Sequence, residues 1–352
     1  ILGISCFYHD SAACLLKNDK IVCAFQEERF TRIKFDNSFP INSIKSCLEY
    51  ANLNIKDLTC ISFYENPSLK LDRIIKTSLR YGINPYKKSN NLVKWFSNKF
   101  HIENYIRKEL SFEGDLFFFN HHQSHAASAF YPSPFLEAGI ITMDGVGEWN
   151  TCTHSLGNNN EIKQVREDNF PHSLGMFYSA FTYYCGFKVL SGEYKLMGLA
   201  PYGTPKYINL IKDNLLEIKH DGKININLNY FEFQKYEKMF NEKLENLFGF
   251  KKRNKNGELN QDYLDIASSV QKITEEVMLK NVKSLIEKHH ISNLCLAGGV
   301  ALNCVANGRI DQESGIKNIW VQPASGDAGT AIGAAYLALY KNYGFERNDE
   351  TI

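Results

Sequence analysis

His121 and His125 lie four residues apart, in a stretch that continues with small, helix-favouring residues. Residues i and i+4 differ by about 40° around an α-helix, so the two imidazoles can point at one ion while His122 points elsewhere. Asp144 ends an apolar, β-branched run and is followed by Gly145, which is typical of a buried strand with a carboxylate at its tip. Two imidazoles and a carboxylate suit iron(II), zinc or manganese, and the pattern predicts a metal site.

The same residues also have a purely structural interpretation. A histidine pair at this spacing can be incidental on a helix, and Asp-Gly can be only a turn. The sequence lacks the motif His-Glu-x-x-His, so metalloprotease chemistry would lack its general base.

Two glycine-containing loops suggest a nucleotide site. Gly298 and Gly299 follow an apolar strand and precede a helix, and backbone without Cβ lets a flat base or ribose approach the chain. The loop that contains Gly326 leads into a helix of small residues, where Asp327 either caps the helix or is a fourth metal ligand. Asp327 can have both roles if one carboxylate oxygen caps the helix and the other binds the metal.

A third polar cluster, at 190–203, contains Gly192, Glu193 and Lys195. Charged residues among glycines favour a loop that faces a ligand. Lys195 is either a phosphate contact or a surface lysine.

The elements that must position these residues form a repeated pattern. Three strands and a helix are predicted at 1–7, 14–17, 20–25 and 41–53, and again at 138–143, 149–156, 161–165 and 173–184. A duplicated unit predicts an α/β fold of two similar lobes with a cleft, as in the actin, sugar-kinase and Hsp70 superfamily, with nucleotide and metal in the cleft. We expect the first lobe at 1–135 and the second at 136–352. Surface insertions are expected at 83–110 and 204–262, and a long amphipathic helix at 263–290.

Composition restricts the function classes. Of 352 residues, 44% are hydrophobic and 22% charged, with 40 basic and 39 acidic side chains, which is typical of a soluble protein without a polyelectrolyte partner. The basic run at 251–255 is interpreted as a solvated loop. Nine cysteines without a Cys-x-x-Cys pair, and no apolar run of membrane-spanning length, predict a cytoplasmic protein with no membrane contact.

The chain resembles the O-carbamoyltransferases, the family of nodulation-factor, cephem and aminoglycoside carbamoyl transfer. The motifs that carry the resemblance lie in order along the chain at 9–13, 27–34, 121–126, 144–145, 192–203, 298–303 and 326–329. The resemblance implies a domain similar to the tRNA threonylcarbamoyl transferase fold. It also implies an iron(II)-type metal held by His121, His125, Asp144 and Asp327.

The resemblance further implies that carbamoyl phosphate and ATP give carbamoyl-adenylate, whose carbamoyl group passes to a hydroxyl of a small-molecule or sugar acceptor in a biosynthetic pathway. In such proteins a C-terminal domain of the YrdC type makes the adenylate. This chain ends at Ile352 without that domain, so we expect the domain to be supplied in cis or in trans.

Acyl-type transfer requires a base for the acceptor and stabilisation of a developing anion. His9 is expected to be the base, although a loop histidine can simply bind backbone. Lys34 and Lys195 are expected to hold the phosphate or the carbamoyl oxygen. The nucleotide is assigned to a further set of residues: Asp10, Gly192, Glu193, Gly298, Gly299 and Asn303.

Two other functions stay open. A threonylcarbamoyl transferase acting on tRNA would share the fold and the histidine pair, but the near-neutral charge of +1 makes a nucleic-acid partner less favoured. A non-catalytic nucleotide-binding subunit would bind metal and nucleotide without transferring anything.

Overall fold

The first half of the molecule is built on a five-stranded sheet. The computed structural model describes residues 1–83, 101–235 and 238–347. The strand order is β3-β2-β1-β4-β5, in which β1, β2 and β3 are antiparallel and β4 and β5 run parallel to β1. The bounds are β1 (Leu2–Ser5), β2 (Ala12–Lys17), β3 (Lys20–Gln26), β4 (Cys60–Phe63) and β5 (Asp115–Phe118).

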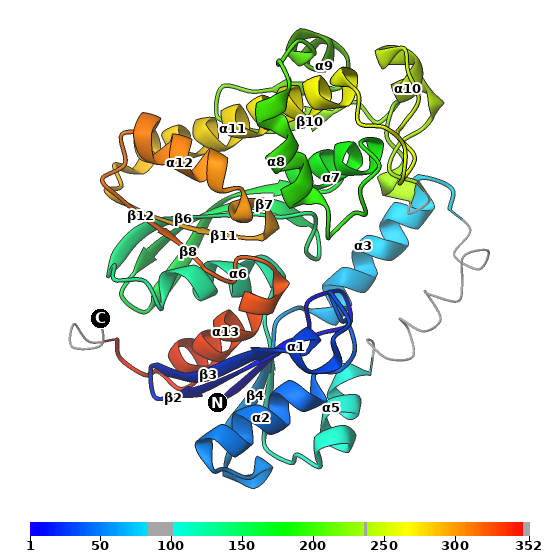
Figure 1. Ribbon diagram of the computed structural model, residues 1–352. Helices are drawn as coiled ribbons and strands as arrows, with labels where there is room; N and C mark the ends of the chain where they lie inside the picture. The colour runs from blue at the N-terminus through cyan, green and yellow to red at the C-terminus, as the bar shows by residue number, and fades with distance from the viewer. Residues whose placement is uncertain (84–100, 236–237, 348–352) are drawn as a thin grey trace.

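The second half repeats this sheet. Its order β12-β11-β6-β7-β8 has the same sequence of antiparallel and parallel pairs. The bounds are β6 (Glu137–Met143), β7 (Asn150–Asn158), β8 (Glu161–Asn169), β11 (Asn293–Ala297) and β12 (Asn318–Val321). The predicted duplication and the two-lobed α/β fold class are therefore confirmed (Figure 1).

Two helices, α6 (His121–Phe130) and α13 (Asp327–Leu337), lie between the sheets (Figure 1). Each packs on the sheet of the other half: α6 contacts β6 and β11, while α13 contacts β1 and β2. The two helices also pack against each other, which needs small residues. A Cβ on Gly333 would lie 1.8 Å from the carbonyl oxygen of Ser124. This contact brings residues from both halves into one buried layer.

The other helices lie outside the layer between the two sheets, on the outer faces of the sheets or along their sides (Figure 1). The first half contains α1 (Glu28–Thr31), α2 (Ile41–Ala51), α3 (Pro67–Arg80) and α5 (Ile102–Leu110). The second contains α7 (Leu174–Tyr184), α8 (Glu193–Leu199), the long α11 (Gln261–His289) and α12 (Cys304–Glu313). No helix within the described ranges is both long and apolar enough to cross a lipid bilayer.

The segments expected as insertions differ in what they contribute. Of 83–110, residues 84–100 lie outside the described residues, and the last part forms α5. The segment at 204–262 forms α9 (Ile208–Asn214), β9 (Leu216–Ile218), β10 (Ile224–Ile226) and α10 (Glu242–Phe248). It also buries Phe231, Phe240 and Phe248 in the same hydrophobic cluster as Tyr184, so it adds to the core of the second half.

Candidate metal centre

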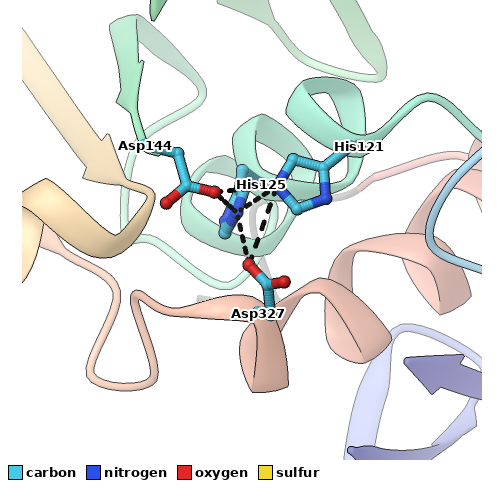
Figure 2. Close-up of side chains that lie close together, drawn as sticks. All are labelled: His121, His125, Asp144 and Asp327. Atoms are coloured by element: carbon cyan, nitrogen blue, oxygen red, sulfur yellow. Dashed lines mark hydrogen bonds and ion pairs between the residues drawn. The ribbon is translucent and has the colours of Figure 1, made fainter. Parts of the chain in front are cut away.

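Four side chains converge between the two sheets. The Nε2 atom of His121 lies 2.9 Å from Oδ2 of Asp144, and the Nε2 atoms of His121 and His125 are 3.1 Å apart (Figure 2). Oδ1 of Asp327 lies 3.7 Å and 3.6 Å from these two nitrogens. One potential ligand atom from each residue falls within 4.8 Å of the others, and all four residues are buried. The structure thus brings the four predicted ligands together.

The two histidines lie about one turn apart at the start of α6. Glu148, in the loop after β6, accepts hydrogen bonds from the backbone N–H of His121 at 2.9 and 3.1 Å. A carboxylate at this position is favourable because the first N–H groups of a helix lack intrahelical acceptors. Gly147 allows the loop to come this close, since a Cβ there would lie 2.9 Å from the ring of His121.

Asp144 is held by contacts from three segments. Its N–H donates to the carbonyl of Thr151 at 3.0 Å, and its carbonyl accepts from the hydroxyl of Ser173 at 3.1 Å. The N–H of Gly299 donates to its Oδ1 at 3.3 Å, which leaves Oδ2 facing the histidines. Gly298 has φ +91° and lies so near β6 that a Cβ would be 2.2 Å from the carbonyl oxygen of Met143. The glycine pair expected to bind nucleotide thus also packs against the carboxylate.

Asp327 is the first residue of α13, and Gly326 occupies the N-cap position. Asp327 therefore does not occupy the capping position, which was one of the two roles expected for it. Both carboxylate oxygens are buried and lack a hydrogen-bond partner among the described residues. The histidines lie 3.5–3.7 Å from these oxygens and form no hydrogen bond to them, an arrangement that fits a cation bound between Asp327, Asp144 and the histidines.

The charges of the centre reinforce one another. Burial opposes protonation of His125, but Asp144 and Asp327 outweigh it and raise the pKa of that ring to about 9. Burial raises the pKa of carboxyl groups, yet His9, His121 and His125 lower that of Asp327 to about 2. Two ionised carboxylates and two imidazoles form a nitrogen and oxygen donor set that suits a first-row divalent ion, which would displace protons on binding.

His122 points away from this cluster, as expected from its position on the helix. Its Nδ1 lies 2.6 Å from the hydroxyl of Thr142. Burial and the neighbouring histidines lower its pKa to about 3. The ring is therefore neutral and serves packing.

His9, from the loop between β1 and β2, reaches the same centre. Its Nε2 lies 3.5 Å from Oδ2 of Asp327, and its Nδ1 lies 3.0 Å from Oδ2 of Asp10. Burial opposes protonation, but Asp327 and Asp10 raise the pKa of His9 to about 9. The first hairpin loop thus contributes a histidine oriented by its own neighbour.

Lys34 and Lys195 lie around one exposed ring on α8. Their Nζ atoms are 5.4 Å and 5.8 Å from the ring centroid of Tyr194, although Lys34 belongs to the first half and Lys195 to the second. Among the described residues, neither lysine forms a hydrogen bond or an ion pair with any of the four predicted metal-ligating residues. Their expected phosphate contacts stay a prediction.

Glu193 and Asn303 have internal partners. Glu193 accepts from the hydroxyl of Ser179 at 2.7 Å and from the N–H of Gly192 at 3.1 Å, which closes the loop before α8. Asn303 caps α12 through the N–H of Ala306 and exchanges two hydrogen bonds of 3.0 Å with Gln271. These contacts give both side chains a structural role, and their assignment to nucleotide binding stays untested.

Glu148 and Ser173 are the supporting residues that sequence reasoning missed. Glu148 could have been suspected from the sequence, because it is an acidic residue at the end of a glycine-containing loop and directly before a predicted strand. Ser173 directly precedes a predicted helix, which is the pattern of an N-cap, but its second contact to the Asp144 loop depends on tertiary structure.

Residues 1–336 match the family model described as "Carbamoyltransferase N-terminus". An uncharacterized protein of Synechocystis is 50% identical over 354 residues, which cover 97% of this chain and 57% of that protein. The nodulation protein NolNO of Sinorhizobium fredii is 32% identical over 337 residues, covering 94% of this chain and 46% of that protein. The chain thus spans about half the length of these relatives.

Two solved structures share the fold at low sequence identity. Component A of the (R)-2-hydroxyglutaryl-CoA dehydratase of Acidaminococcus fermentans aligns with TM-score 0.52 and 16% identity over 97% of this chain and 98% of that one. HypF of T. kodakarensis aligns with TM-score 0.51 and 12% identity over 99% of this chain and 49% of its own. The matched parts of both structures share the fold described above.

Proposed function

This chain belongs to the carbamoyltransferase family and matches the N-terminal part of that family, and we propose that it transfers a carbamoyl group to a hydroxyl of a small-molecule or sugar acceptor. The observation that carries the proposal is the convergence of His121, His125, Asp144 and Asp327, with His9 3.5 Å from Asp327. This proximity, in a layer formed by both halves, supports a base at His9 next to a cation held by the four residues.

The donor is carbamoyl-adenylate, made from carbamoyl phosphate and ATP. In the transfer step the acceptor oxygen forms a bond to the carbamoyl carbon, the bond from that carbon to the phosphate oxygen breaks, and AMP leaves. A bound divalent ion, with Fe²⁺ as the candidate, would polarise the carbamoyl carbonyl as a Lewis acid.

The chain itself supplies the base and its orientation. Asp10 holds Nδ1 of His9 at 3.0 Å, which fixes the direction of Nε2. A cation bound by Asp327 would share the charge of that carboxylate, and Nε2 of His9, 3.5 Å from it, would then be free to accept the proton of the acceptor hydroxyl. This is the logic of a histidine oriented by a carboxylate.

The nucleotide is assigned to the chain segments around this centre. The adenosine is assigned to the backbone at Gly298 and Gly299 because this turn lies directly beside Asp144, whose Oδ1 accepts the N–H of Gly299. Lys34 and Lys195, one from each half, can neutralise the phosphate. Because the relatives are about twice as long, the adenylate is proposed to come from a YrdC-like domain, in cis or in trans.

The test offers preformed carbamoyl-adenylate to the protein loaded with Fe²⁺ under anaerobic conditions, together with a panel of hydroxyl compounds. We expect AMP release and a carbamoylated product, both dependent on the metal. AMP release at the rate of a protein-free control for every hydroxyl compound would contradict the proposal. Transfer that requires tRNA would instead indicate the threonylcarbamoyl transferase function.

A further inference from the structure

A cavity of about 230 Å³ lies outside the metal centre, where α3 of the first half meets the second half. The C-terminal end of α3 contributes Arg80 and Tyr81. The segment that follows β8 contributes Phe170 and His172, and Lys223 borders the cavity from the hairpin of β9 and β10. The walls thus combine two aromatic rings with three nitrogen donors.

Positive charge exceeds negative charge at this cavity. Its carboxylate, Asp168, is already paired with Arg166 at 2.6 Å and with Lys223 at 3.3 Å. Arg80 is exposed and forms no ion pair or hydrogen bond within the part of the chain that the structure describes. The guanidinium of Arg80 is therefore free to meet an anion that enters the cavity.

His172 adds a donor of fixed direction. Its Nδ1 accepts the N–H of Ile226 at 3.0 Å, so the proton of the neutral ring is on Nε2. Burial, together with Lys223 and Arg80, lowers the pKa of His172. His172 lines the cavity, and the N–H at Nε2 is the donor that its ring retains for a ligand.

A second, buried cation lies behind the aromatic wall. The guanidinium carbon of Arg73 is 5.3 Å from the ring centroid of Phe170, and Arg73 is only 4% exposed. Its Nε and Nη1 atoms are buried without a hydrogen-bond partner among the described residues. Arg73 lies two turns before Arg80 on α3, on the same side of the helix. A buried cation with two unbonded nitrogens at this place makes the potential of the wall more positive.

The cavity wall is bonded to the loop that carries Asp144. The hydroxyl of Thr151 donates to the carbonyl of His172 at 2.7 Å, while the carbonyl of Thr151 accepts from Asp144 at 3.0 Å. Ser173, the next residue, donates to the carbonyls of Asp144 and Gly145 at 3.1 and 2.6 Å. The wall of the cavity is therefore linked by hydrogen bonds, through Thr151 and Ser173, to the strand end that bears a candidate metal ligand.

We propose that this cavity binds an anionic group, a carboxylate or a phosphate, of the hydroxyl acceptor. Arg80, Lys223 and His172 hold the anion, and Tyr81 and Phe170 contact the carbon skeleton next to it. The cavity is smaller than a typical ligand pocket and takes only this part of the acceptor. The assignment to the acceptor rests on the proposed transfer function, whereas anion binding itself does not.

The test measures binding of three small probes by calorimetry: phenyl phosphate, benzoate and the neutral benzyl alcohol. We expect one or both anions to bind more tightly than benzyl alcohol. The double variant Arg80→Gln/Lys223→Gln should weaken anion binding at least about tenfold, because a charge-assisted hydrogen bond is worth about this factor. Lys317→Gln is the matched control, since this exposed lysine lies at the opposite end of the second sheet, before β12.

Three results would overturn the assignment: equal affinity of the double variant, equal binding of the alcohol, or anion binding that disappears in His125→Ala but not in the double variant. The last result would place the anion at the metal centre. Anion binding that depends on Arg80 and Lys223, in a protein that transfers nothing to any hydroxyl, would retain the cavity as an anion site and reject only the transfer function.

Discussion

The Nε2 atom of His125 lies 3.6 Å from Oδ1 of Asp327, across the contact between α6 and α13. The two helices follow different copies of the repeated sheet, and each packs on the other copy. The candidate metal centre therefore exists only when both halves are assembled. Its geometry depends on how closely the two helices approach.

Gly333→Ala tests this dependence. A Cβ at this position would lie 1.8 Å from the carbonyl oxygen of Ser124, so the helices must separate. We expect a loss of about 1–3 kcal/mol in the free energy of unfolding, typical of overpacking, and weaker metal binding. The control is Gly308→Ala on α12, where an added Cβ meets nothing within 4 Å and alanine favours the helix by about 0.5–1 kcal/mol. Urea denaturation that ranks the two variants equally would refute the proposed packing constraint.

Asp327→Asn tests the orphaned carboxylate. A ligand that binds only the folded state stabilises it by about 2.7 kcal/mol at a hundred times its dissociation constant. We expect Fe²⁺ or Mn²⁺ to raise the melting temperature of the wild-type protein and to leave that of Asp327→Asn unchanged. Thermal scans with and without metal measure this, and an equal rise in both proteins would remove Asp327 from the site.

His9→Asn separates catalysis from binding. His9 lies beside Asp327 but is not one of the four clustered ligands. We expect metal and nucleotide to bind as in the wild type, while transfer falls about 10²–10⁴-fold, the usual contribution of a general base. Single-turnover transfer assays measure the loss, and wild-type turnover would exclude His9 as the base.

His154 should make the protein sensitive to acid. This buried ring of β7 lies 2.9 Å from Oδ1 of Asn281, and burial lowers its pKa from 6.5 to about 4. Between these values the unfolded chain binds a proton that the folded protein does not, so stability falls as pH decreases from about 6.5 to 4. The full effect is about 3 kcal/mol.

His154→Gln should flatten this part of the stability profile. Denaturation at a series of pH values compares the two proteins, and the difference between them isolates His154 from the other histidines. Parallel curves for wild type and variant would show that the ring is protonated without cost to the fold.

The sequence predicted the duplicated fold because strands, turns and helices leave periodic patterns that recur in the second half. His121, His125 and Asp144 were identifiable because they stand at the start of a helix or the end of a strand, where α/β folds place their chemistry. Asp327 was left open between a helix cap and a ligand, and the family resemblance assigned it to the metal. The exchange of α6 and α13 between the sheets was not predicted, since it depends on packing and not on local pattern. The roles of Arg73 and Arg80 were not predicted either, because only the tertiary structure brings these basic residues of α3 close to Phe170 and His172.

The most direct test of the account measures metal content and transfer in the same samples. Elemental analysis should find one metal ion per chain in the wild type and in His289→Ala, a control on the exposed end of α11, and both should transfer the carbamoyl group. His125→Ala should contain no stoichiometric metal and should not transfer, while its circular dichroism stays that of the wild type. Full metal content in His125→Ala, or transfer by the metal-free wild type, would contradict the account.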